Sequence, residues 1–186
     1  MKKILLLLVL LSLSPLALAS TFTLNFEQYP EFTQIVGQYE AEDIVFGNAM
    51  QLVAPDYNYF DYPPHSGSGV LTDDPNDPLG FGFITPVTDV SGWYSDPYGV
   101  TAIAFGFYGN VLGTFTGAPV IGADSEFTLD PEGGIYDIVL IDSSQTPDFL
   151  TLDDLTYTET PEPGSLLLLG TGVLGLVGTM RRKLRR

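Results

Sequence analysis

The chain has 186 residues, of which 23 are Asp or Glu, 7 are Lys or Arg, one is His and none is Cys. Lack of cysteine excludes a disulfide framework, a thiol nucleophile and a cysteine-ligated metal centre. The formal net charge of −16 makes nucleic acid an unfavourable partner, because phosphates would be repelled. The length allows one folded domain.

Positive charge is confined to the two ends of the chain. The cations are Lys2, Lys3 and five residues within 181–186, whereas the stretch from Ile4 to Met180 holds all 23 acidic residues and no Lys or Arg. That stretch therefore has a formal charge of −23. We expect both ends to serve in targeting and the folded middle to be a polyanion without Lys or Arg of its own.

Residues 1–19 have the pattern of a secretory signal peptide. Two lysines are followed by an apolar run, and Ala17 and Ala19 supply the small residues of a cleavage site before Ser20. The alternative is an uncleaved anchor, but Pro15 interrupts an apolar run that is already short. The sequence predicts export with cleavage.

Residues 20–158 are expected to form an all-β domain. Gly and Pro recur throughout, sustained helical periodicity is absent, and apolar residues alternate with polar or small ones over short runs. Many short strands separated by turn signals are typical of an antiparallel, jelly-roll-like β-sandwich. The predicted strands cover residues 22–26, 44–47, 50–53, 70–72, 81–85, 103–107, 111–116, 125–129, 135–141 and 150–157.

The last predicted strand contains an irregularity. Leu150 and Leu152 share one parity, whereas Leu155 and Tyr157 share the other, so the alternation slips at Asp153-Asp154. A β-bulge would keep both pairs on the core face and would direct two carboxylates toward one place.

The residues of the domain allow three kinds of chemistry to be considered: cation binding, sugar binding and hydrolysis. Carboxylates that lie close together in a domain without Lys or Arg could bind a structural Ca²⁺. The rings of Trp93 and Tyr94, if exposed, could stack on a sugar. The alternatives are solvated carboxylates and buried aromatic rings. A hydrolase is disfavoured, because His65 is the only histidine and a Gly-x-Ser-x-Gly motif is absent. We expect no catalytic residue.

The C-terminal end has three parts in a fixed order. A Pro-rich turn, Pro161, Glu162, Pro163 and Gly164, precedes an uncharged run over residues 165–180 and a basic cluster. The run is slightly short for a bilayer-spanning helix, a deficit that snorkelling arginines and local thinning of the bilayer can offset. The cluster predicts a cytoplasmic stop and is formed by Arg181, Arg182, Lys183, Arg185 and Arg186.

This tail, residues 159–186, resembles the PEP-CTERM sorting signal of Gram-negative bacteria. The resemblance implies recognition by exosortase, transient anchoring in the inner membrane, cleavage near Pro-Glu-Pro and delivery to the cell surface or extracellular matrix. A plain membrane anchor would share the apolar run and the arginines but would not need the Pro-Glu-Pro.

The domain itself resembles the jelly-roll β-sandwiches that often precede this signal. The matching segments are Gly37-Gln38-Tyr39, Ile44-Val45-Phe46, Pro63-Pro64-His65-Ser66-Gly67, Val90-Ser91-Gly92-Trp93 and Leu152-Asp153-Asp154-Leu155. The resemblance implies a structural calcium where the first and last strands meet, held by Glu27 and by Asp153 or Asp154.

The sequence thus predicts an exported, non-enzymatic protein of the cell surface or biofilm matrix. Its expected partners are the export machinery, exosortase and, transiently, the membrane. A carbohydrate-binding module acting on polysaccharide is the alternative, and an adhesion subunit bridged by Ca²⁺ is a third interpretation.

Overall fold

The computed structural model describes residues 19–54, 62–73, 78–142 and 150–160, together with 170–172 and 175. One compact unit of the chain is the body, Ser20–Thr160, which ends two residues beyond the predicted boundary. Residues 1–18 of the predicted signal peptide, and all residues predicted as sorting motif and basic tail, lie outside the described residues.

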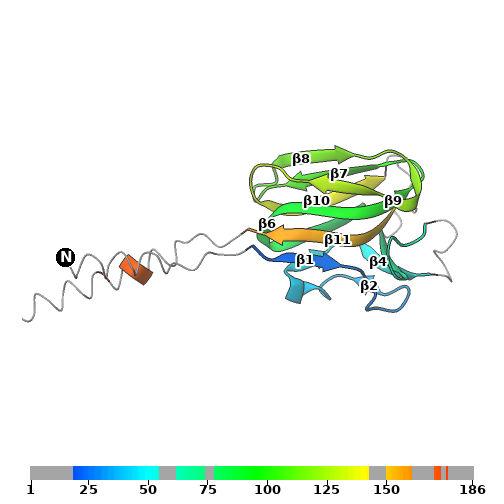
Figure 1. The fold of residues 1–186 in the computed structure, drawn as a ribbon, viewed down its shortest axis with the longest axis horizontal. Coiled ribbons are helices and arrows are strands. Elements are labelled where there is room, and N and C mark those ends of the chain that lie inside the picture. The colour runs from blue at the N-terminus through cyan, green and yellow to red at the C-terminus, as the bar shows by residue number, and fades with distance from the viewer. Residues whose placement is uncertain are drawn as a thin grey trace, which may run out of the picture. The chain divides into compact units, whose positions relative to one another are not determined.

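The described body is all-β apart from one short 3₁₀ turn, and its strand pairings are all antiparallel (Figure 1). Its elements are β1 (Thr21–Leu24), β2 (Gln34–Ile35), η1 (Glu40–Glu42), β3 (Ile44–Phe46), β4 (Ala49–Val53), β5 (Gly69–Asp73), β6 (Leu79–Asp96), β7 (Val100–Phe105), β8 (Val111–Thr116), β9 (Val120–Leu129), β10 (Ile135–Asp142) and β11 (Thr151–Glu159). The prediction of an antiparallel all-β fold is confirmed.

The long strand β6 belongs to both layers of the sandwich. Its first half pairs with β3 and β10, and β10 continues to β7 and β8. Its second half pairs with β9 and β11. Beyond β11 lie β1 and β5, and β5 continues to β4 and β2. A strand that passes from one sheet to the other is a corner of the kind found in jelly rolls.

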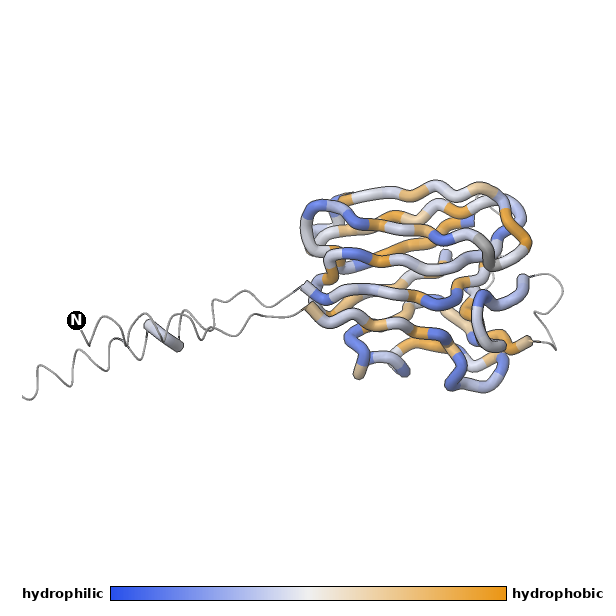
Figure 2. The backbone as a smooth tube through the Cα atoms, viewed as in Figure 1, coloured by the Kyte–Doolittle hydropathy of each residue, from blue (hydrophilic) through white to orange (hydrophobic). Residues whose placement is uncertain are grey.

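One apolar core fills the space between the two layers. The Phe83 ring of one layer lies 5.0 Å from the Tyr157 ring of the other, and Phe22 stacks on the same tyrosine at 5.5 Å. Hydrophobic residues recur along the strands of both layers (Figure 2). Their inward-facing members are buried, as the sequence alternation predicted.

The bulge predicted in the last strand is confirmed. The pairing of β11 with β6 shifts register between Asp153 and Thr156, and Asp154 has a positive φ of 45°. Leu152 and Leu155 are both fully buried, although their sequence parity differs. The extra residue therefore keeps the apolar side chains on the core face.

Two strand assignments from sequence were wrong. Strand β6 continues to Asp96 through Pro86, so that Trp93 and Tyr94, which lay outside every predicted strand, are part of one. Strand β7 ends at Phe105, and Phe107 lies in the following turn with 69% of its surface exposed. The short strand β2 was not predicted.

None of the helices in the described part of the chain is long and apolar enough to cross a bilayer. Gly170, Thr171, Gly172 and Gly175 are helical. The rest of the predicted spanning run, residues 165–180, lies outside the described residues, so the transmembrane helix stays a prediction.

Candidate functional site

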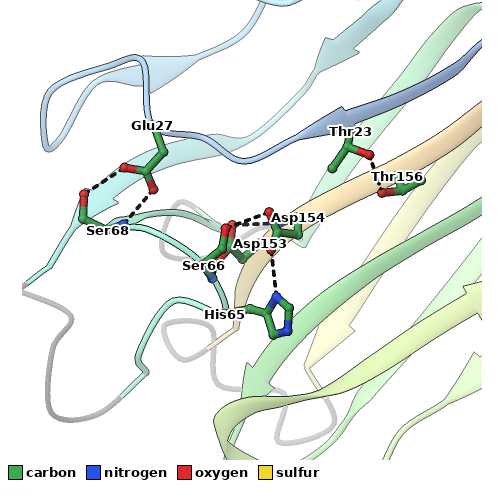
Figure 3. Close-up of polar contacts among 8 residues, drawn as sticks. All are labelled: Thr23, Glu27, His65, Ser66, Ser68, Asp153, Asp154 and Thr156. Atoms are coloured by element: carbon green, nitrogen blue, oxygen red, sulfur yellow. Dashed lines mark hydrogen bonds and ion pairs between the residues drawn. The ribbon is translucent and has the colours of Figure 1, made fainter.

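The residues predicted to bind calcium, Glu27, Asp153 and Asp154, lie along one edge of β11, where its neighbouring strand changes. Strand β5 pairs with Thr151 and Leu152, and β1 pairs with residues 155–158. The bulge at Asp153-Asp154 lies between these two pairings, and residues 65–69, which lead into β5, cover it (Figure 3). We call residues 65–69 with Glu27, Asp153 and Asp154 the clasp.

Glu27 holds the end of this segment from the β1 side. Its Oε1 accepts hydrogen bonds from the backbone N–H groups of Ser68 and Gly69, both at 2.7 Å, and its Oε2 accepts the Ser68 hydroxyl at 2.9 Å. Partial burial acts to raise the pKa of Glu27, but these hydrogen bonds outweigh it and leave the pKa below its ordinary value.

The two aspartates hold the start of the segment. Asp153 is 1% exposed, and its carboxylate accepts the backbone N–H of Ser66 at 2.8 Å and that of Asp154 at 2.7 Å. Asp154 accepts the Ser66 hydroxyl at 2.9 Å and lies 2.7 Å from Nδ1 of His65. The three carboxylates thus hold residues 65–69 through three backbone N–H groups and three side chains.

His65 also covers the only tryptophan. Its ring lies parallel to the Trp93 indole, at 3.8 Å between centroids and 7° between planes. Trp93 is half-buried on the outer face of β6, between Asp153 on one neighbouring strand and Glu126 on the other. One face of the indole is therefore already occupied by the imidazole.

Two glycines of the clasp cannot carry a side chain. A Cβ on Gly69 would collide with the backbone carbonyl of Phe26, and one on Gly67, which has a φ of +57°, would collide with the Glu27 carboxylate. The Ser-Gly-Ser-Gly run at residues 66–69 therefore provides hydroxyl donors and close backbone approach in alternation.

The buried carboxyl of Asp153 makes the clasp sensitive to pH. Burial and the charge of Asp154 raise its pKa to about 6, against opposing backbone hydrogen bonds from Ser66, Asp154 and His65. In the unfolded chain the pKa of an aspartate is about 3.9. Between about pH 4 and pH 6 the folded state therefore binds more protons than the unfolded state. The contribution of Asp153 to stability is complete below about pH 4 and is lost as the pH rises through about 6.

We therefore expect the midpoint of thermal unfolding, measured in chelator, to rise on acidification from about pH 7 to pH 5. The Asp153→Asn variant should show a smaller rise, because its side chain does not titrate. An unchanged or falling midpoint in the unsubstituted chain would contradict the expectation. Glu27 has a lowered pKa, so its contribution to stability is lost on acidification, but only at a lower pH.

The oxygens of the clasp are engaged within the protein. Each carboxylate oxygen of Glu27, Asp153 and Asp154 accepts a hydrogen bond or faces His65. In the described ranges no three His, Cys, Asp or Glu side chains form a group able to hold a metal ion. Calcium on Glu27 and Asp153 or Asp154 stays a prediction.

The clasp does not contain a hydrolytic relay. The Ser66 hydroxyl donates to Asp154, the same carboxylate that faces His65, so serine and histidine share an acceptor instead of being bonded to one another. A nucleophilic serine would instead need the histidine as its base. This geometry gives no support to catalysis at His65.

The residues predicted to bind sugar have different environments. Tyr94 is 1% exposed, faces the core and donates its hydroxyl to the Ala118 carbonyl, so its ring offers no surface for stacking. The prediction that Tyr94 contacts a glycan is corrected on this ground. Trp93 keeps an exposed part but is stacked on His65.

A second aromatic group, not singled out from sequence, lies at the β7–β8 turn. Tyr108 is 90% exposed and Phe107 is 69% exposed. The Phe107 ring contacts those of Tyr108 and Tyr136 at 5.2 and 5.1 Å. The only sequence signal was the turn Phe-Tyr-Gly-Asn at residues 107–110, whose aromatic side chains lie between two strands and not within one.

The outer face of the same layer carries a shallow groove of about 530 Å³. Glycines form part of its floor, and apolar side chains and one carboxylate complete the lining, which includes Val45, Gly47, Gly80, Gly82, Ile84, Asp137 and Val139. Asp137 of this lining follows Tyr136, whose ring the Phe107 ring contacts. A shallow apolar surface and exposed rings are each suited to the apolar faces of sugar rings.

Comparison with known proteins identifies the tail. Residues 159–183 match the PEP-CTERM protein-sorting motif. This motif marks a protein that is exported and sorted through the membrane. A search of curated proteins gave no match.

Solved structures similar to the body include adhesin and carbohydrate-binding domains and, over a quarter of their length, two glycoside hydrolases. The K2 cleaved adhesin domain of Lys-gingipain is 16% identical, with a TM-score of 0.49, over 74% of this chain and 99% of that one. The K1 domain from Porphyromonas gingivalis W83 is 12% identical, with a TM-score of 0.47, over 76% and 99%. The xylan-binding module CBM86 from Roseburia intestinalis is 13% identical, with a TM-score of 0.40, over 77% and 96%.

Proposed function

We propose that this chain, which carries a PEP-CTERM sorting motif, is an exported, non-enzymatic protein that exosortase processes and delivers to the cell surface or biofilm matrix. The observation that carries the proposal is the match of residues 159–183 to the motif. The motif coincides with the Pro-Glu-Pro turn, the uncharged run and the basic cluster, in the order that a sorting tail requires.

The end of the folded body supports processing at this place. Strand β11 ends at Glu159, and the N–H of Thr160 donates to the Pro86 carbonyl at 3.0 Å. Cleavage beside Pro161–Pro163 would therefore remove no residue of the last strand. The body would keep its β11 pairings with β6 and β1 after the tail is lost.

Intact-mass measurement of the protein recovered from the cell surface tests the proposal. The expected mass lacks residues 1–19 and the residues after about 163, with any added mass identifying an attached group. A variant with alanine at Pro161, Glu162 and Pro163 should keep its tail and stay in the membrane fraction. Recovery of the unsubstituted chain with leader and tail both intact would contradict the proposal.

Carbohydrate binding is the second candidate activity, and the exposed rings of Phe107 and Tyr108 favour it. Exposed aromatic rings beside the groove could stack on neutral sugar rings, whereas the polyanionic body would repel an anionic polysaccharide.

A glycan array with the purified chain tests this activity. We expect binding of neutral polysaccharides to fall at least about tenfold in Phe107→Ala and Tyr108→Ala, as expected for lost stacking on a ring. Trp93→Ala, on the other layer, is the matched control and should bind normally. Loss of glycan binding in Trp93→Ala alone would place the binding surface at the clasp instead. Failure of the unsubstituted chain to bind any glycan would reject the activity.

A further inference from the structure

A buried carboxylate with an unpartnered oxygen lies at the end of β6. Asp96 is 0% exposed. Its Oδ1 accepts the backbone N–H groups of Tyr98 at 2.7 Å and Gly99 at 2.9 Å. Its Oδ2 is also buried and has no hydrogen-bond partner among the residues that the structure describes. An unsatisfied buried carboxylate oxygen is costly, so a partner that the described residues do not supply would stabilise this atom.

A second buried carboxylate lies beside it. Asp142 ends β10, is 7% exposed and pairs with Val100, the first residue after the Asp96–Gly99 turn. Burial raises the pKa of Asp96 to about 6 against the backbone hydrogen bonds from Tyr98 and Gly99, and the two carboxylates are close enough for the charge of Asp142 to add to this rise. Like charges in a buried place repel strongly unless something neutralises them.

The chain cannot supply that neutralising charge through Lys or Arg. None occurs between Ile4 and Met180, and the single histidine, His65, faces Asp154. Only a proton or a cation from solution remains. Oδ2 of Asp96 has no described acceptor to which a bound proton could be donated, which favours the cation.

From this geometry we propose that Asp96 and Asp142 bind a hard divalent cation, Ca²⁺, at the ends of β6 and β10. Carboxylate oxygens are the ligands that Ca²⁺ prefers, and backbone carbonyls and water complete its usual six to eight positions. The site is separate from the clasp, where each carboxylate oxygen is already engaged. It does not depend on the sorting tail or on glycan binding.

Calcium titration of the purified, chelator-treated chain tests the proposal at about pH 7. At about 1 mM, a concentration typical of extracellular calcium sites, Ca²⁺ should raise the midpoint of thermal unfolding by at least about 5 °C. Asp96→Asn and Asp142→Asn should each remove this shift. Asp153→Asn and Glu27→Gln, which alter the clasp, should keep it.

Direct binding keeps the test decisive if Asp96→Asn fails to fold. Calorimetric titration of Ca²⁺ into the unsubstituted chain and into Asp142→Asn should show affinity at least about tenfold lower in the variant. Absence of binding in the unsubstituted chain would overturn the proposal. So would equal binding in Asp142→Asn, or a shift lost only in the two clasp variants, which would place the ion at Glu27 and Asp153.

Discussion

Replacement of Tyr157 by alanine should lower the free energy of unfolding by about 3–5 kcal/mol, the range for removal of a large buried ring. The side chain is fully buried and contacts the rings of Phe22 and Phe83. Its hydroxyl donates to the Glu42 carbonyl. The variant would leave a cavity where the last strand meets both its own layer and the opposite one.

Urea denaturation of the purified chain, followed by Trp93 fluorescence, measures this loss. Tyr157→Phe should cost about 1 kcal/mol, because it removes only the hydrogen bond to Glu42. Tyr108→Ala, at a residue 90% exposed, should change stability by less than about 0.5 kcal/mol. A cost below about 1 kcal/mol for Tyr157→Ala would show that the core does not close around this ring.

Replacement of Asp153 by alanine should destabilise the fold by about 2–3 kcal/mol. Two backbone N–H groups, of Ser66 and Asp154, lose their acceptor under the clasp. Relief of the buried charge offsets part of this cost, because the raised pKa of Asp153 shows that its ionised form is disfavoured.

Denaturant unfolding compared across three variants separates these contributions. Asp153→Asn keeps an acceptor without a charge and should cost less than Asp153→Ala. Asp130→Ala, at an exposed aspartate of the same chain, should be nearly neutral. Equal stability of Asp153→Ala and Asp130→Ala would mean that the carboxylate does not hold residues 65–69 in place.

Sequence reasoning succeeded where alternation and burial agree. Strand β8 was predicted with its observed bounds, and the parity slip between Leu152 and Leu155 located the bulge, because a strand with one buried face tolerates no other register. It failed where a local signal opposed the tertiary context. The strand predicted at residues 81–85 stopped before Pro86, but β6 continues through this proline, which lies at the corner where the strand leaves one sheet for the other.

The candidate sites were only partly predictable, since their contacts join distant residues. Glu27 and Asp153 were placed together by resemblance, and both do hold residues 65–69, though at different atoms. No pattern along the chain linked His65 to Trp93 or Asp96 to Asp142. The absence of Lys and Arg was visible from the start, but which buried acids lack a partner depends on the packing.

The central place of the last strand has a consequence for biogenesis. Because β11 lies between β6 and β1, its absence would leave two open edges in the middle of a layer. A nascent polypeptide therefore cannot complete its fold until residues 150–160 have been synthesised, and such long-range pairing is intrinsically slow. Because the fold forms slowly and late, the chain would stay unfolded, and able to pass through a secretion pore, until its final strand has passed.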